Sequence, residues 1–143
     1  MAQIFVPYHL FRVEIADGRR HQTSHFAIDA VSGTLDVYRF EQGIADLDLV
    51  PLRSSNRVGA RLDVGDAWPL LEDRLQRILF QTGFFRLRNP RVSGEPERVD
   101  LHVPYWVGFY EHGPQVRLQV LDAVRGRFEG AKARALVESW LVG

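Results

Sequence analysis

The pentapeptide Asp29-Ala30-Val31-Ser32-Gly33 recurs as Asp122-Ala123-Val124-Arg125-Gly126, and Val6-Pro7-Tyr8 recurs as Val103-Pro104-Tyr105. The spacing between the two motifs is four residues shorter in the second copy, as a shorter hairpin turn would produce. An apolar pattern of helical spacing then follows each copy. Because these matches occur in the same order, the sequence predicts an internal duplication over about residues 4–82 and 100–142.

Each copy has the pattern of three strands followed by a helix. Runs rich in β-branched and aromatic residues, separated by turn signals such as Asp17-Gly18, indicate the strands. Within each pentapeptide, the aspartate can accept hydrogen bonds from the turn backbone and the glycine can take a left-handed conformation. The expected strands are 5–15, 23–28 and 34–40 in the first copy and 100–110, 116–121 and 127–129 in the second.

Two apolar stripes predict the helices. The first begins after Asp66, a good N-cap residue, and ends before Gly83. We expect both helices to pack on the sheet, with a homodimer contact through the second helix as the alternative. The stripes are Ala67, Leu70, Leu71, Leu75, Ile78 and Leu79 in the first helix and Ala133, Leu136, Val137, Trp140 and Leu141 in the second.

These elements predict an α+β fold in a single domain spanning residues 1–143. We expect an antiparallel sheet, or two small sheets, from two related βββα halves with two packed helices. Residues 41–65 and 88–98 lie outside the repeat. Their glycine, proline, serine and asparagine residues predict a long connection with one short strand and a loop, respectively.

The composition excludes several classes of protein. The charges of the 18 basic and 18 acidic residues cancel, so the formal net charge is zero. This argues against charge-driven binding to nucleic acid or to anionic membrane. Of the basic residues 17 are arginine, which we attribute to genomic codon bias. The chain has no cysteine, so disulfides, thiolate zinc sites and iron–sulfur clusters are excluded. We expect a cytoplasmic protein without a cofactor and without membrane insertion, because no signal peptide or spanning segment is visible.

Residues 103–110, 120–126 and Gly130-Ala131-Lys132 resemble a module of poorly characterised bacterial proteins with the pattern Y-P-x-W, D-x-x-x-G and G-x-K. In that family the module is often attached to zinc-ribbon or membrane segments and is sometimes labelled helicase- or primosome-related. The turn at residues 29–33 is also similar to that of small PepSY-type domains, which are thought to bind or inhibit partners. The chain departs from the pattern at Val103, where a tyrosine is expected, and at His9, where the first copy lacks the tryptophan. The resemblance implies a binding module and no catalytic residue.

An aromatic strand is the first candidate site. Alternation along residues 103–110 places Tyr105 and Phe109 on one side and Trp106 and Tyr110 on the other. One side is expected in the core, while the other would form an aromatic patch around Gly108 for a partner protein or an apolar ligand. The alternative is a strand buried on both sides. A pocket between the two halves, lined by Tyr8, Tyr105, Trp106 and Tyr110, would suit a small molecule.

Two further clusters are weaker candidates. Arg86 and Arg88 alternate with apolar residues after Phe84, as in proteins that stack bases and contact phosphates, but amphipathic strands have the same pattern. His21 and His25 have a spacing that could bind a metal if a third ligand joined them, although two exposed histidines explain the spacing equally well. No nucleotide-binding glycine loop or nucleophile elbow is present.

The sequence therefore favours a non-enzymatic protein-binding or adaptor module with an unidentified protein partner. The first alternative is a small-molecule-binding regulatory domain with a pocket between the two halves. The second is an accessory protein for single-stranded nucleic acid.

Overall fold

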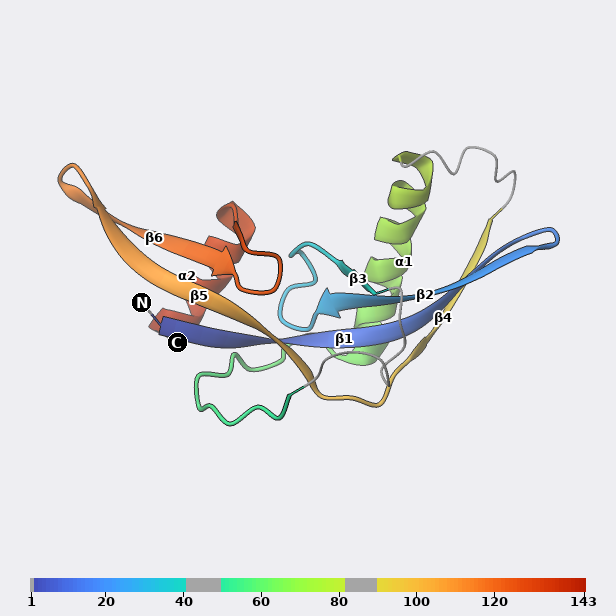
Figure 1. Cartoon of the computed structure of the whole chain (residues 1–143), viewed down its shortest axis with the longest axis horizontal. Coiled ribbons are helices and arrows are strands. Elements are labelled where there is room, and N and C mark those ends of the chain that lie inside the picture. The colour runs from blue at the N-terminus through green and yellow to red at the C-terminus, as the bar shows by residue number, and fades with distance from the viewer. Residues whose placement is uncertain (1, 41–49, 82–89) are drawn as a thin grey trace.

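A computed structural model describes residues 2–40, 50–81 and 90–143 as a curled antiparallel sheet with two helices, which is an α+β fold (Figure 1). Neither helix has the length and apolar character that crossing a membrane requires. The elements in chain order are β1 (Ala2–Asp17), β2 (Arg20–Asp29), β3 (Tyr38–Phe40), α1 (Val64–Gln81), β4 (Arg91–Pro96), β5 (Leu101–His112), β6 (Gln115–Asp122), β7 (Arg127–Phe128) and α2 (Ala131–Val142).

Strand β1 organises the sheet, whose order is β3-β2-β1-β5-β6-β7. Its first half pairs with β5 from Ala2 opposite Val107 to Tyr8 opposite Leu101. Its second half lies between β2 on one edge and β4 on the other. The two ends of β1 thus belong to different parts of the sheet, and the β1–β2 and β5–β6 hairpins project at opposite ends of the molecule (Figure 1).

The recurring pentapeptides form the turns that the sequence predicted. The Oδ1 atom of Asp29 accepts hydrogen bonds from the backbone N–H groups of Val31, Ser32 and Gly33. The Oδ1 atom of Asp122 accepts from Val124 and Arg125 in the same way. Gly33 and Gly126 have φ angles of 71° and 69°, in the left-handed region that favours glycine. Both aspartates are fully buried, so these hydrogen bonds provide the partners that a buried carboxylate requires.

Cross-strand pairing defines two faces of the sheet. Tyr8 pairs with Asp29 and Leu101, and we call their side the Tyr8 face. Phe11 pairs with Phe26 and Pro96 on the opposite side, which we call the Phe11 face. The two faces alternate along β1 because successive strand residues point to opposite sides.

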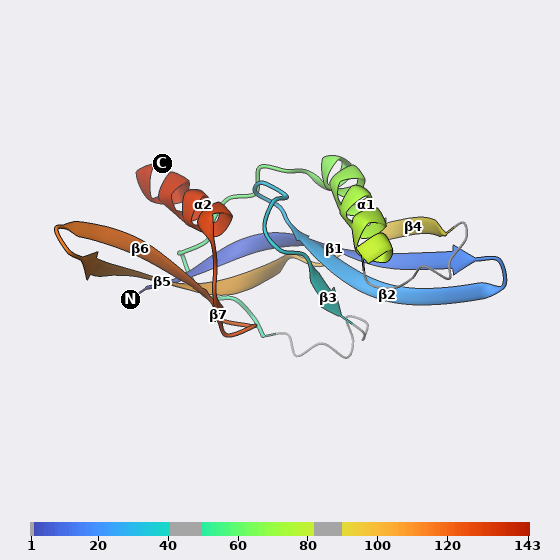
Figure 2. The same ribbon diagram turned by 90° about the horizontal axis from the view of Figure 1, so that it is seen from above.

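The two helices pack on different faces of the strands. Buried residues of α1, including Leu71 and Leu75, form a core with Phe11 and Val13. Buried residues of α2 form a core with Tyr8 and residues of β5 and β6 on the Tyr8 face. Figure 2 nevertheless shows both helices on the same side of the molecule. The right-handed twist along the sixteen residues of β1 reconciles these facts, because it turns one face toward α2 at one end and the other face toward α1 at the other.

Strand β4 corrects the sequence analysis, which predicted a loop over residues 88–98. Residues 91–96 pair instead with β1 from Phe11 to Ala16. The prolines and glycine that suggest a loop are compatible with this strand because, among the described strands, it pairs with β1 and lies at an edge. Gly94 also leaves room for the ring of Trp68 from α1.

The third strand is also shorter than the predicted range of 34–40. The first residues of the predicted range belong to the turn instead, where Leu35 N–H donates a hydrogen bond to Asp29 Oδ2 at 2.9 Å. The backbone carbonyls of Thr34 and Leu35 accept hydrogen bonds from Arg74 of α1. Within the described residues, the third strand therefore pairs with β2 through Tyr38, Arg39 and Phe40.

We expect Gly94→Ala to lower the free energy of unfolding by about 1–3 kcal/mol, because a β-carbon there would overlap the Trp68 ring. Urea denaturation followed by tryptophan fluorescence measures the change. Gly59→Ala is the matched control, since a β-carbon at Gly59 meets no atom within 4 Å. Equal stability of the two variants would contradict the packing of Trp68 on β4.

Candidate protein-binding site

The outer part of the β5–β6 hairpin extends beyond the rest of the sheet. Strand β1 pairs with β5 only as far as Val107. Residues 108–112 pair with β6 through five cross-strand pairs from Gly108 to His112. On its other edge, β5 carries no paired strand at residues 109–112 within the described part of the chain. We call residues 109–112 the open edge.

Backbone direction along β5 shows which groups face the open edge. The carbonyl of Pro104 accepts from Ala123 N–H at 3.1 Å, so Pro104 directs its backbone toward the β6 side. In an antiparallel strand, alternate residues direct their N–H and C=O groups to the same edge. Phe109 and Glu111, at odd positions, therefore direct their backbone groups toward the open edge. These groups are available to an added strand.

The corresponding edge of β1 is closed within the same molecule. Beyond its pairing with β5, β1 pairs with β4 from Phe11 to Ala16. The junction is joined by a hydrogen bond of 2.8 Å from Glu97 N–H to the carbonyl of Leu10. Taking Val6-Pro7-Tyr8 and Val103-Pro104-Tyr105 as equivalent, Arg12 and Glu14 correspond to Phe109 and Glu111. Strand β4 covers the first pair, and no described strand covers the second.

Apolar side chains surround the open edge. Phe109 is 66% exposed, and Trp106 and Tyr110 are each 38% exposed. The tip of the β1–β2 hairpin contrasts with it, because residues 20–23 of β2 are exposed and polar. Exposed aromatic residues beside an unpaired strand edge are typical of an interaction site.

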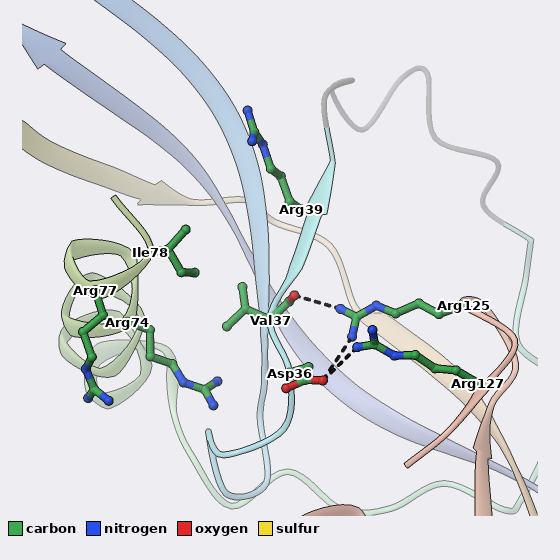
Figure 3. A pocket seen from close by; sticks show the side chains of 8 residues that line it. All are labelled: Asp36, Val37, Arg39, Arg74, Arg77, Ile78, Arg125 and Arg127. Carbon is green, nitrogen blue, oxygen red and sulfur yellow. Dashed lines mark hydrogen bonds and ion pairs between the residues drawn. The ribbon is translucent and has the colours of Figure 1, made fainter. Parts of the chain in front are cut away.

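An arginine-lined cleft lies elsewhere, between α1, the segment leading into β3 and the turn after β6 (Figure 3). The sequence analysis missed this cleft. Its residues are far apart in the chain, and no motif of fixed spacing connects them. The excess of arginine over lysine was the only available signal, and it was attributed to composition. The lining residues are Asp36, Val37, Arg39, Arg74, Arg77, Ile78, Arg125 and Arg127.

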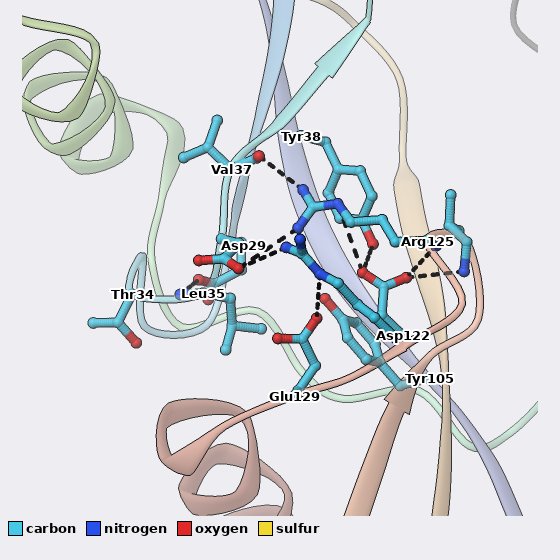
Figure 4. A network of polar contacts seen from close by, with 12 residues as sticks. Asp29, Thr34, Leu35, Val37, Tyr38, Tyr105, Asp122, Arg125 and Glu129 are labelled. Atoms are coloured by element: carbon cyan, nitrogen blue, oxygen red, sulfur yellow. Dashed lines mark hydrogen bonds and ion pairs between the residues drawn. The ribbon is translucent and has the colours of Figure 1, made fainter. Parts of the chain in front are cut away.

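A buried polar network connects the two parts of the sheet (Figure 4). The hydroxyl oxygens of Tyr8 and Tyr105 are 2.6 Å apart. The Tyr38 hydroxyl donates to Asp122 Oδ2, and the Tyr38 ring packs edge-on against Tyr8 with centroids 5.4 Å apart. The Arg125 guanidinium lies 3.7 Å from the centroid of the Tyr38 ring on its face. Each of these polar groups thus contacts another group of the protein, which supports a structural role for the network.

Burial keeps these tyrosines protonated. It raises the pKa of Tyr105 to about 12, with the Asp122 carboxylate adding to the effect. Burial is also the main cause that raises the pKa values of Tyr8 and Tyr38 well above their usual range, with hydrogen bonds to Tyr105 and Asp122, respectively, acting in the same direction. Burial raises the pKa of Glu129 as well, and Asp122 contributes. Each shift disfavours a further negative charge near the buried Asp122.

The predicted site residues do not gather at one surface. Tyr8 and Tyr105 are in contact but buried in the core. Trp106 and Tyr110 lie on the opposite face of β5, where both are partly exposed. Residues 86 and 88, the two predicted arginines, lie outside the described residues.

The two histidines lie near different carboxylates. His21 Nε2 lies 3.6 Å from Glu14, and His25 Nε2 lies 3.8 Å from Glu97. In the described ranges, no group of three or more histidine, aspartate or glutamate side chains is placed to hold a metal ion.

In comparisons with known proteins, no protein-family model, no curated protein and no solved structure matches the chain. The resemblance of residues 103–132 to a bacterial module therefore stays a prediction.

We expect the free energy of unfolding to fall as the pH rises above about 10. The folded pKa of Tyr105, about 12, exceeds its ordinary value of 10.0, so its stabilisation is complete below pH 10 and is lost between pH 10 and 12. The slope should approach about 1.4 kcal/mol per pH unit for each buried tyrosine. Urea denaturation at several pH values measures it. Tyr105→Phe should reduce the slope, and equal slopes for the two proteins would contradict the role of Tyr105.

Proposed function

We propose that the protein is a non-enzymatic binding module that accepts an extended segment of a partner protein as an added strand on the open edge of β5. The observation that carries the proposal is that no described strand pairs with residues 109–112 at the position equivalent to the one that β4 takes beside β1. Addition of a strand supplies backbone hydrogen bonds for affinity, and the alternating side chains of the segment supply specificity.

The exposed side chains indicate what such a segment would carry. Phe109 and Glu111 lie on one face of β5, because both are separated by an even number of positions from Tyr105. Cross-strand neighbours stabilise a sheet most when apolar groups meet and when opposite charges pair. The partner segment should therefore place an apolar side chain beside Phe109 and a basic one beside Glu111. On the other face, Tyr110 favours a further apolar or aromatic side chain.

We also propose that the two parts of the sheet are duplicated units. Tyr8 pairs with Asp29 as Tyr105 pairs with Asp122. A backbone hydrogen bond from Ala30 to Pro7 has its counterpart from Ala123 to Pro104. In this proposal the duplicated unit is the strand hairpin with its aspartate turn. The helices pack on different faces, and β4 accompanies only the first unit. The absence of cysteine fits a cytoplasmic location, which we propose as well.

A displayed library of random peptides, selected on the whole protein, provides a defined test of binding. We expect selected peptides to have the apolar and basic pattern described above. Glu111→Pro should weaken their binding about tenfold or more, because proline removes the N–H group that faces the open edge. Val116→Pro is the matched control on the opposite edge of the same hairpin, and it should leave binding unchanged.

Amide hydrogen exchange locates the bound peptide. Binding should protect the amides of Phe109 and Glu111, which face the open edge. Tyr110 N–H faces β6, so its exchange should change less. Equal loss of binding in both proline variants, or selection of no peptide, would contradict the proposal. A dimer of the free protein that Glu111→Pro dissociates would identify a second copy of the chain, rather than a different protein, as the occupant.

A further inference from the structure

The arginine-lined cleft is a separate concave site with a volume of about 570 Å³. Its size falls in the range of about 300–1,000 Å³ that is typical of small-molecule sites. Five arginines and one aspartate line it. Figure 3 shows Arg74 approaching Asp36 from α1, while Arg125 of the turn after β6 and Arg127 of β7 approach from the opposite side.

Two of these guanidinium groups are held in place by neutral partners. Arg74 donates to the carbonyl oxygens of Leu35 at 2.6 Å and Thr34 at 2.9 Å. Arg125 donates to the carbonyl oxygen of Val37 at 2.8 Å and stacks on Tyr38. Carbonyl groups orient a guanidinium without cancelling its charge. Both arginines are therefore positioned for an anion before one arrives.

The carboxylates near the cleft neutralise only part of its charge. Asp36 Oδ2 lies 2.8 Å from Arg127 and 3.8 Å from Arg125. Arg77 pairs with Asp73, Arg125 also lies 3.8 Å from Asp122, and Arg127 lies 4.0 Å from Glu129. Among the described residues, Arg39 and Arg74 have no carboxylate partner. Counted over the described residues, the arginines of the cleft thus outnumber the carboxylates beside them, and donors are left over because each guanidinium carries five N–H groups.

Asp36 shows where an anion would bind. Its carboxylate accepts a hydrogen bond from Arg127, and its side chain is 63% exposed. A carboxylate bound between arginines in a partly exposed position occupies the place that an oxyanion from solvent could take. Phosphate is a stronger match, because it offers more acceptor oxygens and more charge to the guanidinium fork.

We propose that this cleft binds the phosphate group of a small phosphorylated molecule, held by Arg74, Arg125 and Arg127 after Asp36 moves aside. The site goes beyond the protein-binding function, since it shares no residue with the open edge of β5. The described lining residues include no aromatic side chain on which a base could stack, and the chain has zero net charge. Both facts favour a small ligand over a nucleic acid.

Isothermal titration calorimetry with pyrophosphate at low ionic strength tests the site. We expect saturable binding of one pyrophosphate that Arg127→Gln weakens about tenfold or more, because one charge-assisted contact is lost. Arg127 is half exposed, so this variant should fold normally. Arg134→Gln, an exposed arginine on α2 outside the cleft, is the matched control and should bind as the wild type does.

Asp36→Asn provides a test in the opposite direction. Removing the competing carboxylate should tighten pyrophosphate binding several-fold, whereas a variant that only disturbed the fold would weaken it. The third test is the same titration with a single-stranded oligonucleotide, which should neither bind tightly nor displace pyrophosphate.

Three results with pyrophosphate would overturn the proposal. These are no binding of pyrophosphate by the wild type, equal weakening by Arg127→Gln and Arg134→Gln, or weaker binding by Asp36→Asn. Tight oligonucleotide binding that pyrophosphate does not displace would also reject a small-ligand site.

Discussion

The antiparallel pairing of β1 with β5 holds the structure together. It is centred on Phe5 opposite Pro104, and it joins the two hairpins into one sheet. The same pairing brings the hydroxyl groups of Tyr8 and Tyr105 into contact and places Tyr38 against Asp122. The buried Asp122 accepts a hydrogen bond from the backbone of Arg125 and so fixes the turn that carries this arginine. The β1–β5 pairing therefore also positions one side of the arginine cleft. The core and the cleft therefore depend on one set of backbone hydrogen bonds.

Two prolines lie within the β1–β5 pairing without breaking it. The carbonyl of Pro7 accepts from Ala30, so Pro7 directs its backbone away from β5. Its missing N–H group therefore lies at the edge where β2 has already ended, since β1 pairs with β2 only from Tyr8 onward. Pro104 is placed in the same way at the end of β6. A proline inside a central strand is usually unfavourable, and here each marks the residue where one neighbouring strand ends.

The sequence predicted the features that depend on neighbouring residues. The hairpins and the aspartate turns were predictable because alternation and the Asp-to-Gly spacing are local signals, and Gly33 and Gly126 confirm the turns. Strand β4 was not predictable, because Ser93-Gly94 and Glu95-Pro96 indicate a loop unless the neighbouring edge of β1 is known. The cleft was hidden for a related reason: Arg74 and Arg125 meet only after the sheet has formed.

The difference between the two hairpins follows from how each is covered. Around the second half of β1, β4 closes one edge and α1 covers the Phe11 face, so that hairpin presents a polar tip. On β5, twist turns the Tyr8 face toward α2, and no described strand closes residues 109–112. Phe109 stays exposed there, whereas Arg12, at the same distance from the first Val-Pro-Tyr motif as Phe109 from the second, is paired with Glu95 of β4. An apolar side chain where the covered hairpin carries an ion pair is consistent with an edge that is completed by another protein.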